Sequence, residues 1–315
     1  MESQNGFKLV SRLLIAFGVM FINLFLFSIL AEFLCKAFYD ISISGYLANP
    51  IPDSPKTNEI NAMRMFQGIV SLGTFVISAF VISLIFKERP LEYLGLDSFP
   101  KPVYLLIVPV LLIVSMPFLS WLVEMNSKLT LPAFLSGLEN TLKEMELKNE
   151  RMYDLMLTMD NYNQLFLNLL VMALIPALGE ELFCRGVLLN VIYDYSGKFL
   201  RSVIIVALIF TLFHMQFYKF VPMMVLALLL GLFINWTHSL WASILFHFLN
   251  NTFAVAGSFY YQRGVKNILT DDTAHMPYLL TIGSFIITIA LIAWINKYSK
   301  RNSEITDQRS DNTTN

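Results

Sequence analysis

The feature that most constrains the fold of this chain is a series of long, nearly uncharged apolar runs. A transmembrane helix needs about 20 mostly apolar residues, and eight segments come close to that length. They lie at approximately Leu13–Leu34, Phe66–Phe86, Val103–Val123, Leu165–Ile192, Leu200–Phe217, Phe220–Trp236, Leu240–Tyr260 and Tyr278–Ile295. The predicted fold class is therefore all-α, a polytopic membrane protein with about eight transmembrane helices in one bundle.

Composition excludes several other classes of protein. Of the 315 residues, 56% are apolar and only 14% are charged, whereas a soluble domain carries roughly 25% charged residues. The formal net charge of −1 provides no basic surface for a nucleic acid. The two cysteines, Cys35 and Cys184, both lie in apolar stretches and indicate neither a disulfide framework nor a zinc cluster. A soluble enzyme, a disordered chain and a nucleic-acid-binding protein are all disfavoured.

Three regions follow from the distribution of the apolar runs. Residues 1–160 hold the first three spans and an amphipathic segment, residues 161–296 hold spans four to eight, and residues 297–315 form a polar tail that is expected to be disordered. Within 131–160, apolar residues recur at helical spacing, as in a helix that lies in the membrane interface. They are Phe134, Leu135, Leu138, Leu142 and Met145. This helix is either a lid over a lateral opening or a plain surface helix, and the plain surface helix is the simpler interpretation.

Lysine and arginine residues gather in connections that share one side of the membrane if there are eight spans. They are Lys8, Arg12, Lys87, Arg89, Lys101, Lys198, Arg201, Lys297, Lys300 and Arg301. Because an excess of these residues marks cytoplasmic loops, the chain is predicted to be an integral multi-pass membrane protein with both termini in the cytoplasm.

The strongest chemical signal is a cluster of ionisable residues in span four. An ionisable residue within a span costs roughly 2.5–3.5 kcal/mol on insertion scales and suggests a function. Glu181 and Arg185 are four residues apart and can neutralise each other on one helix face. Glu180 is rotated by about 100° from Glu181 and has no cation one turn further on. A buried carboxylate without a partner has a raised proton affinity, which suits a general base. The alternative is a structural polar patch between helices.

Two other spans contribute histidines. His214 follows Phe210 by one turn in span five, and His247 precedes Asn251 by one turn in span seven. Together with Glu180, the two histidines could bind a zinc-like ion, because two imidazoles and a carboxylate form a known catalytic ligand set. Alternatively, Glu180 could activate water directly with help from His214, while His247 and Asn251 donate hydrogen bonds to an oxyanion. The second interpretation needs no metal and is favoured.

These residues resemble the three motifs of the CPBP family of intramembrane proteases, which includes the CAAX-processing and bacteriocin-processing enzymes and is also called the Abi family. The motifs are Glu180-Glu181-x-x-x-Arg185, Phe210-x-x-x-His214 and His247-x-x-x-Asn251. The resemblance covers about ninety residues, from span four to span seven. It implies a bundle of eight helices with an intramembrane cavity.

The resemblance also implies an activity and roles for individual residues. The chain would be an intramembrane endopeptidase that acts on a peptide or protein substrate, which can be membrane-associated. Glu180 would be the general base, His214 would help to activate water, and His247 and Asn251 would bind the oxyanion. Glu181, Arg185 and Phe210 would be supporting residues. The enzyme would need either no cofactor or a divalent metal such as zinc, held by Glu180, His214 and His247. Eukaryotic members of the family process prenylated proteins, but nothing in this sequence indicates a prenylated substrate.

Two other functions are compatible with the sequence. The chain could be a non-catalytic immunity or scaffold protein on the same fold, or a proton-coupled transporter that uses its buried glutamates and histidines as a relay. Spans other than four, five and seven are poor in ionisable groups, which disfavours the relay. With the predicted orientation, Glu180 and His247 fall in the cytoplasmic half, whereas His214 lies late in span five. We therefore expect a site in the cytoplasmic half, with either a later start of span five or a stagger between the helices.

Overall fold

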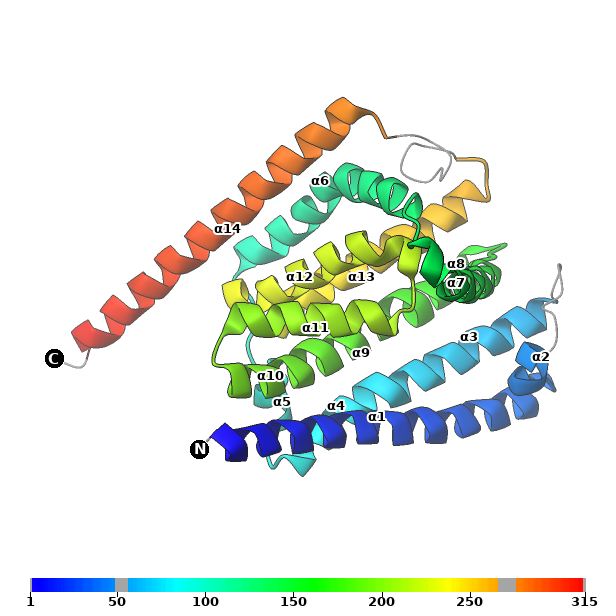
Figure 1. Cartoon of the computed structure of the whole chain (residues 1–315), viewed down its shortest axis with the longest axis horizontal. Coiled ribbons are helices and arrows are strands. Elements are labelled where there is room, and N and C mark those ends of the chain that lie inside the picture. The colour runs from blue at the N-terminus through cyan, green and yellow to red at the C-terminus, as the bar shows by residue number, and fades with distance from the viewer. Residues whose placement is uncertain (1, 49–55, 266–275, 314–315) are drawn as a thin grey trace.

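The computed structural model describes residues 2–48, 56–265 and 276–313, and over this part of the chain it contains only helices and their connections (Figure 1). The elements are α1 Glu2–Tyr39, α2 Ile43–Ala48, α3 Thr57–Ser71, η1 Leu72–Ile77, α4 Ser78–Ile85, α5 Pro90–Tyr93, α6 Pro102–Ser127, η2 Ala133–Leu135, α7 Ser136–Met156, α8 Tyr162–Asn168, η3 Leu169–Leu174, α9 Ile175–Glu181, η4 Leu182–Leu188, α10 Leu189–Ser196, α11 Phe199–Phe213, η5 Phe217–Lys219, α12 Phe220–Thr237, α13 Leu240–Tyr261 and α14 Tyr278–Thr313.

Six helices in the described residues are long and apolar enough to cross a membrane. They are Gly6–Tyr39, Thr57–Ile85, Pro102–Ser127, Tyr162–Ser196, Phe217–Thr237 and Tyr278–Arg301. The chain is therefore an all-α, multi-pass integral membrane protein, as predicted, although the count of eight spans is not confirmed. The two remaining predicted spans correspond to α11, which has only 15 residues, and to α13, which contains a histidine and two asparagines.

Two segments differ from the expectation. Residues 162–196 form one continuous helix that includes the π-helical segments η3 and η4, and periodicity alone did not predict these wider turns. The last helix, α14, continues to Thr313, whereas a disordered tail was expected over 297–315. Extending an existing helix adds one hydrogen bond per residue without a new nucleation step, and no proline or glycine interrupts the segment after residue 297.

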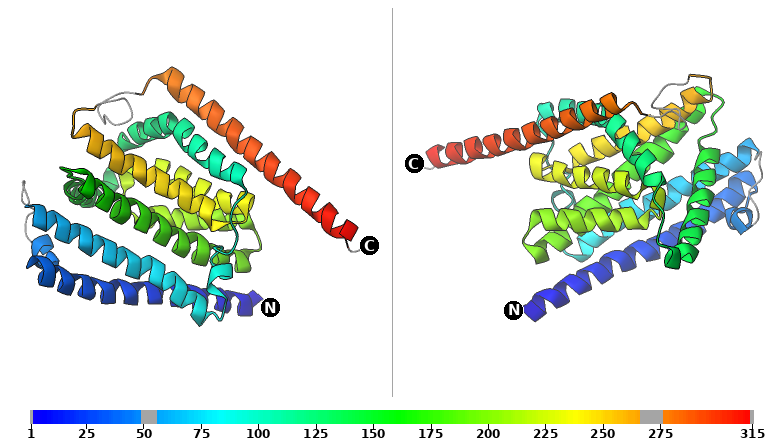
Figure 2. Two further views of the ribbon diagram at one scale, coloured as in Figure 1. Left: turned by 180° about the vertical axis from the view of Figure 1, so that it is seen from behind. Right: turned by 45° about the horizontal axis from the view of Figure 1, so that its top comes forward.

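Both termini lie at one end of the bundle, and α7 lies at the other (Figures 1 and 2). α6 leads from the end with the termini to α7, and the long helix α8–α10 returns toward the termini. α11 then starts from the turn at Gly197, which has a left-handed φ of 60°. This path brings the middle of the α8–α10 helix against α11 and α13 (Figure 1).

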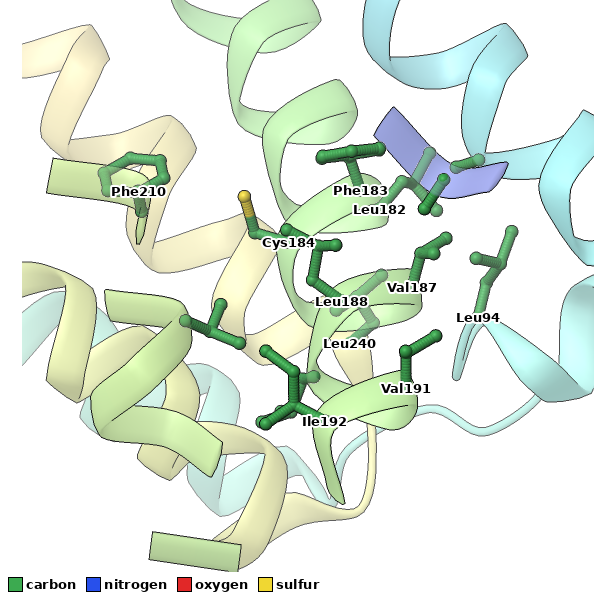
Figure 3. Close-up of a cluster of buried hydrophobic side chains, with 14 of the residues drawn as sticks. Leu94, Leu182, Phe183, Cys184, Val187, Leu188, Val191, Ile192, Phe210 and Leu240 are labelled. Atoms are coloured by element: carbon green, nitrogen blue, oxygen red, sulfur yellow. The ribbon is translucent and has the colours of Figure 1, made fainter. Parts of the chain in front are cut away.

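The main hydrophobic core surrounds the half of the α8–α10 helix that follows the glutamates. In Figure 3, Val187 and Val191 lie on the side of this helix that faces Leu94, while Phe210 lies on the opposite side. Close packing at the start of this region depends on Gly179. A Cβ atom at Gly179 would lie 2.8 Å from the Cβ of Phe75 in η1, so only glycine allows the two helices to approach this closely at the residue before Glu180.

Candidate active site

The site is built on a buried ion pair in the α8–α10 helix. Arg185 donates a hydrogen bond of 2.8 Å from an Nη atom to the Oε1 atom of Glu181, and both side chains are at most 1% exposed. The second Nη of Arg185 donates to the carbonyl of Ala227 in α12 at 2.9 Å. The predicted pairing of Glu181 with Arg185 is therefore present, and it neutralises two charges that would be costly in the membrane if either were alone.

Glu181 also holds His247 of α13. The Nδ1 atom of His247 lies 2.9 Å from Oε1 of Glu181. Because a carboxylate can only accept, Nδ1 carries the proton, and the Nε2 atom is left to face the cavity. The other oxygen of Glu181, Oε2, is buried and has no hydrogen-bond partner among the described residues. Glu181 is therefore a positioning group behind the cavity wall.

His214 lies where α11 ends. Its Nδ1 atom is 2.8 Å from the carbonyl oxygen of Phe210, one of the carbonyls that a helix end leaves without an intrahelical partner. The Nδ1 atom is thus the donor, and Nε2 is free to face the cavity. The Phe210 ring packs on the His214 ring at 4.3 Å between centroids, and the guanidinium of Arg185 lies 4.8 Å above the same phenyl ring. Phe210 therefore links the buried ion pair to His214.

The short α11 explains how His214 reaches the level of Glu180. About 24 Å of helix separates Glu180 from Ser196, and about 22 Å separates Phe199 from His214, at 1.5 Å per residue. Both lengths are measured from the same turn, so the two side chains lie at similar depth. After His214 the chain leaves the helix, and Met215 has a φ of 52°. Such irregular backbone at membrane depth is tolerated where it lines a cavity.

Glu180 lies between the two imidazoles. Its Oε2 atom is 3.8 Å from Nε2 of His214 and 3.8 Å from Nε2 of His247. These gaps are too long for direct hydrogen bonds, but a water molecule in either gap could bond to both groups. The Glu180 side chain is 17% exposed and that of His214 is 31% exposed. The carboxylate is therefore accessible from the cavity rather than sealed in the core.

A cavity with a volume of about 920 Å³ lies beside these groups. Glu180, Phe210, His214, His247 and Asn251 line it, whereas Glu181 and Arg185 are buried behind it. The structure thus brings together all seven residues that were predicted for the site and separates them into a lining group and a supporting group.

Asn250, the neighbour of Asn251, lies three residues after His247, a spacing from which the sequence predicts that it can reach the same helix face. Asn250 also lines the cavity, and its Nδ2 atom lies 3.4 Å from Oδ1 of Asn251. If this contact occupies the Asn251 oxygen, the Asn251 amide hydrogens are free to face the cavity.

The cavity also extends to α7. Residues 148–150, 152–154 and 156 of α7 line it, and α7 lies at the end opposite the termini (Figure 1). The cavity therefore reaches the end opposite the termini, and the expected position of the site in the cytoplasmic half stays a prediction. The cavity extends this far because α11 ends at the depth of Glu180, so that α7 rather than α11 forms the wall beyond it.

The side chains of the described residues were also compared with the arrangement that a metal site needs. Among the described residues, no group of three or more histidine, cysteine, aspartate or glutamate side chains is arranged so that it could hold a metal ion. The ligand set of Glu180, His214 and His247 that was considered from the sequence therefore stays a prediction.

Comparisons with known proteins agree with the three motifs. Residues 162–253 match the family model described as Type II CAAX prenyl endopeptidase Rce1-like. Neither the curated proteins nor the solved structures gave a match. The matched segment runs from α8 into α13 and includes all seven predicted site residues. Over this segment, the resemblance to the CPBP family is confirmed, and the segment is similar to a family of prenyl endopeptidases.

Proposed function

We propose that this protein is an intramembrane endopeptidase in which Glu180 activates a water molecule to cleave a peptide bond. The observation that carries the proposal is the position of the Glu180 carboxylate, 3.8 Å from Nε2 of both His214 and His247. The match of residues 162–253 to a family of endopeptidases supports the same reaction.

The proposed first step uses the gap between Glu180 and His214. Since Nδ1 of His214 donates to the Phe210 carbonyl, Nε2 of the neutral ring is an acceptor. A water in the gap would direct one O–H toward Glu180 and the other toward His214. Glu180 takes a proton as the water oxygen attacks the scissile carbonyl carbon, and the proton is later delivered to the leaving amine.

The developing oxyanion would be bound on the α13 side of the cavity. Asn251 can donate through its amide hydrogens. His247 donates through Nε2 only when its ring is doubly protonated, because its other proton faces Glu181. Removing one such donor typically costs about 10²–10³-fold in kcat.

The test uses the full-length protein in liposomes and a peptide that ends in Cys-a-a-X, supplied with and without a farnesyl group on the cysteine. We expect the wild-type protein to release the C-terminal tripeptide from at least one of the two peptides. Glu180→Gln should abolish the release because the amide cannot take up the proton. The exposed Glu92 of α5 offers a matched control, and Glu92→Gln should cleave like the wild type.

Two results would contradict the proposal. Cleavage by Glu180→Gln at the wild-type rate would exclude Glu180 as the base. Loss of activity after dialysis against EDTA, with recovery on adding zinc, would show that a bound metal, and not Glu180 alone, activates the water. Unfolding of the Glu180→Gln protein at the wild-type temperature shows that any lost activity is not due to misfolding.

A further inference from the structure

The α7 helix contributes hydrogen-bonding side chains to the cavity that the proposed mechanism does not use. Asn149 and Tyr153 are one helical turn apart, and both line the same cavity as Glu180. Within the described part of the chain, neither the Asn149 amide nor the Tyr153 hydroxyl has a hydrogen-bond partner. Polar groups that border a cavity and have no protein partner are available to a ligand.

The chain that follows Tyr153 is held firmly. Arg64 of α3, which is 1% exposed, donates to the carbonyl of Met156 at 2.8 and 3.0 Å and to that of Thr158 at 2.5 Å. Asn168 donates to the Met156 carbonyl as well, at 2.8 Å. Three bonds on one carbonyl, two of them from a buried guanidinium, fix the C-terminal end of α7 against the bundle.

The segment before Tyr153 is tied to the loop that follows His214. Glu150 and Lys219 form an ion pair of 2.8 Å, and the backbone N–H of Tyr218 donates to Glu146 at 3.1 Å. Asn149 and Tyr153 therefore lie in a stretch of helix with an anchor near each end. Side chains on a fixed element bind a ligand with a smaller loss of conformational entropy than side chains on a mobile loop.

The chemistry of the pair matches a peptide backbone. An asparagine amide has the same donor and acceptor groups as a peptide bond, and a phenol can donate to a peptide carbonyl. Both side chains are uncharged, so they bind without regard to the charge of the substrate. Burial, together with the nearby charges of Asp154 and Glu180, raises the pKa of Tyr153, so the phenol remains a donor at physiological pH.

We propose that Asn149 and Tyr153 bind the backbone of the substrate peptide, so that α7 forms a substrate-binding wall of the cavity. This inference rests on the proposed function and deepens it. It assigns the chemistry to α9, α11 and α13, and substrate binding to a helix that lies outside the family match at residues 162–253.

Binding must be measured apart from cleavage. The full-length Glu180→Gln protein in lipid nanodiscs is titrated with a fluorescein-labelled, farnesylated peptide that ends in Cys-Val-Ile-Met, and Kd is read from fluorescence anisotropy. Adding Tyr153→Phe should weaken binding about threefold to tenfold, the usual effect of one lost hydrogen bond. Adding Asn149→Ala should weaken it by a similar factor. The same factors should hold for a peptide with different aliphatic residues, because the backbone is shared.

Two residues serve as matched controls. Asn140 is an exposed asparagine of α7, and Tyr162 is an exposed tyrosine of α8, and neither lines the cavity. Asn140→Ala and Tyr162→Phe should leave Kd within about twofold, the level expected for surface changes that touch no ligand.

The outcomes separate this inference from the proposed function. Unchanged Kd in both Tyr153→Phe and Asn149→Ala would overturn the inference, and so would a Glu180→Gln protein that binds neither peptide. If the wild type fails to cleave while Tyr153→Phe still weakens binding, the inference stands and the proposed reaction fails. Equal unfolding temperatures of Tyr153→Phe and its parent exclude a change in folding as the cause of weaker binding.

Discussion

Glu181 serves two partners with one oxygen, and this arrangement connects stability to the site. Its Oε1 atom contacts both the Arg185 guanidinium and the His247 ring. The ion pair removes the cost of two isolated charges, while the contact with His247 fixes the orientation of the ring that faces Glu180. A change to either member of the pair should therefore affect folding and the site together.

We expect Arg185→Met to lower the free energy of unfolding by about 3–5 kcal/mol, because it leaves Glu181 as a buried carboxylate without its cation. The loss can be measured by unfolding in mixed micelles at increasing denaturant fraction. Arg89 provides the control, since its side chain is 84% exposed in its pair with Glu92. Arg89→Met should change the same free energy by less than about 1 kcal/mol. Equal effects of the two changes would contradict the importance of the buried pair.

Asn250 should act through Asn251. Because the Asn250 amide contacts the Asn251 oxygen, Asn250→Ala removes the group that orients Asn251 but leaves the donor itself in place. On the proposed mechanism, kcat should fall about tenfold in Asn250→Ala, less than the roughly 10²–10³-fold expected for loss of an oxyanion donor in Asn251→Ala. Steady-state kinetics on the cleaved peptide measure both. A larger loss in Asn250→Ala than in Asn251→Ala would reverse the assignment.

Side-chain patterns predicted the members of the site but not their contacts across helices. Ionisable residues inside apolar spans identified Glu180, Glu181, Arg185 and the two histidines, because their cost in a membrane makes them conspicuous. The bond between His247 and Glu181 joins residues 66 positions apart, and nothing local to either residue encodes it. The lining role of Tyr153 was missed for a similar reason, since an amphipathic helix does not reveal which of its faces meets a cavity.

At the scale of elements, the length of α11 determines where His214 lies in the site. The apolar run over 200–217 suggested a complete span, whereas α11 ends at Phe213. The π-helical segments η3 and η4 flank the α9 turn that carries Glu180 and Glu181, and such wide turns often occur at functional sites. Hydrophobic periodicity fixes the existence of a helix far better than its last turn, so these two features could not be predicted.

The contact between α9 and η1 yields a prediction at this scale. Gly179→Ala would place a methyl group 2.8 Å from the Cβ of Phe75, which forces the helices apart next to Glu180. We expect a loss of about 1–3 kcal/mol in the free energy of unfolding, together with reduced cleavage. A Cβ atom added at Gly18 of α1 would meet no neighbouring atom within 4 Å, and Gly18→Ala should be neutral or slightly stabilising. Thermal unfolding in detergent compares the two, and an unaffected Gly179→Ala protein would show that this contact is not required.

At the scale of the whole molecule, the cavity and the termini lie toward different ends. The all-α, multi-pass architecture was predicted from the apolar runs and is confirmed. The extension of the cavity to α7 was not predicted. It depends on how the helices are staggered and not on the composition of any one helix. If both termini are cytoplasmic, as the lysine and arginine distribution predicts, α7 lies on the opposite side of the membrane.

Cysteine labelling tests this arrangement. Cys35 and Cys184 are buried, so single cysteines introduced at Lys87 and Lys148 can be detected with a membrane-impermeant maleimide in intact cells. We expect Lys148→Cys to be labelled from outside the cell and Lys87→Cys only after lysis. The reverse pattern would place both termini outside and α7 in the cytoplasm. Labelling of both positions from one side would contradict the arrangement of the helices.

The shortness of α11 has a consequence for the surrounding lipid. A helix of about 22 Å falls about 8 Å short of a hydrocarbon layer about 30 Å thick, and exposed apolar residues such as Leu208 and Leu212 line its outer face. We expect the bilayer to become thinner beside α11, so that these side chains stay in contact with lipid. Peptide turnover should therefore be faster in liposomes of lipids with short acyl chains than in liposomes of lipids with long ones. The turnover rate would then depend on the mismatch between the length of α11 and the thickness of the bilayer.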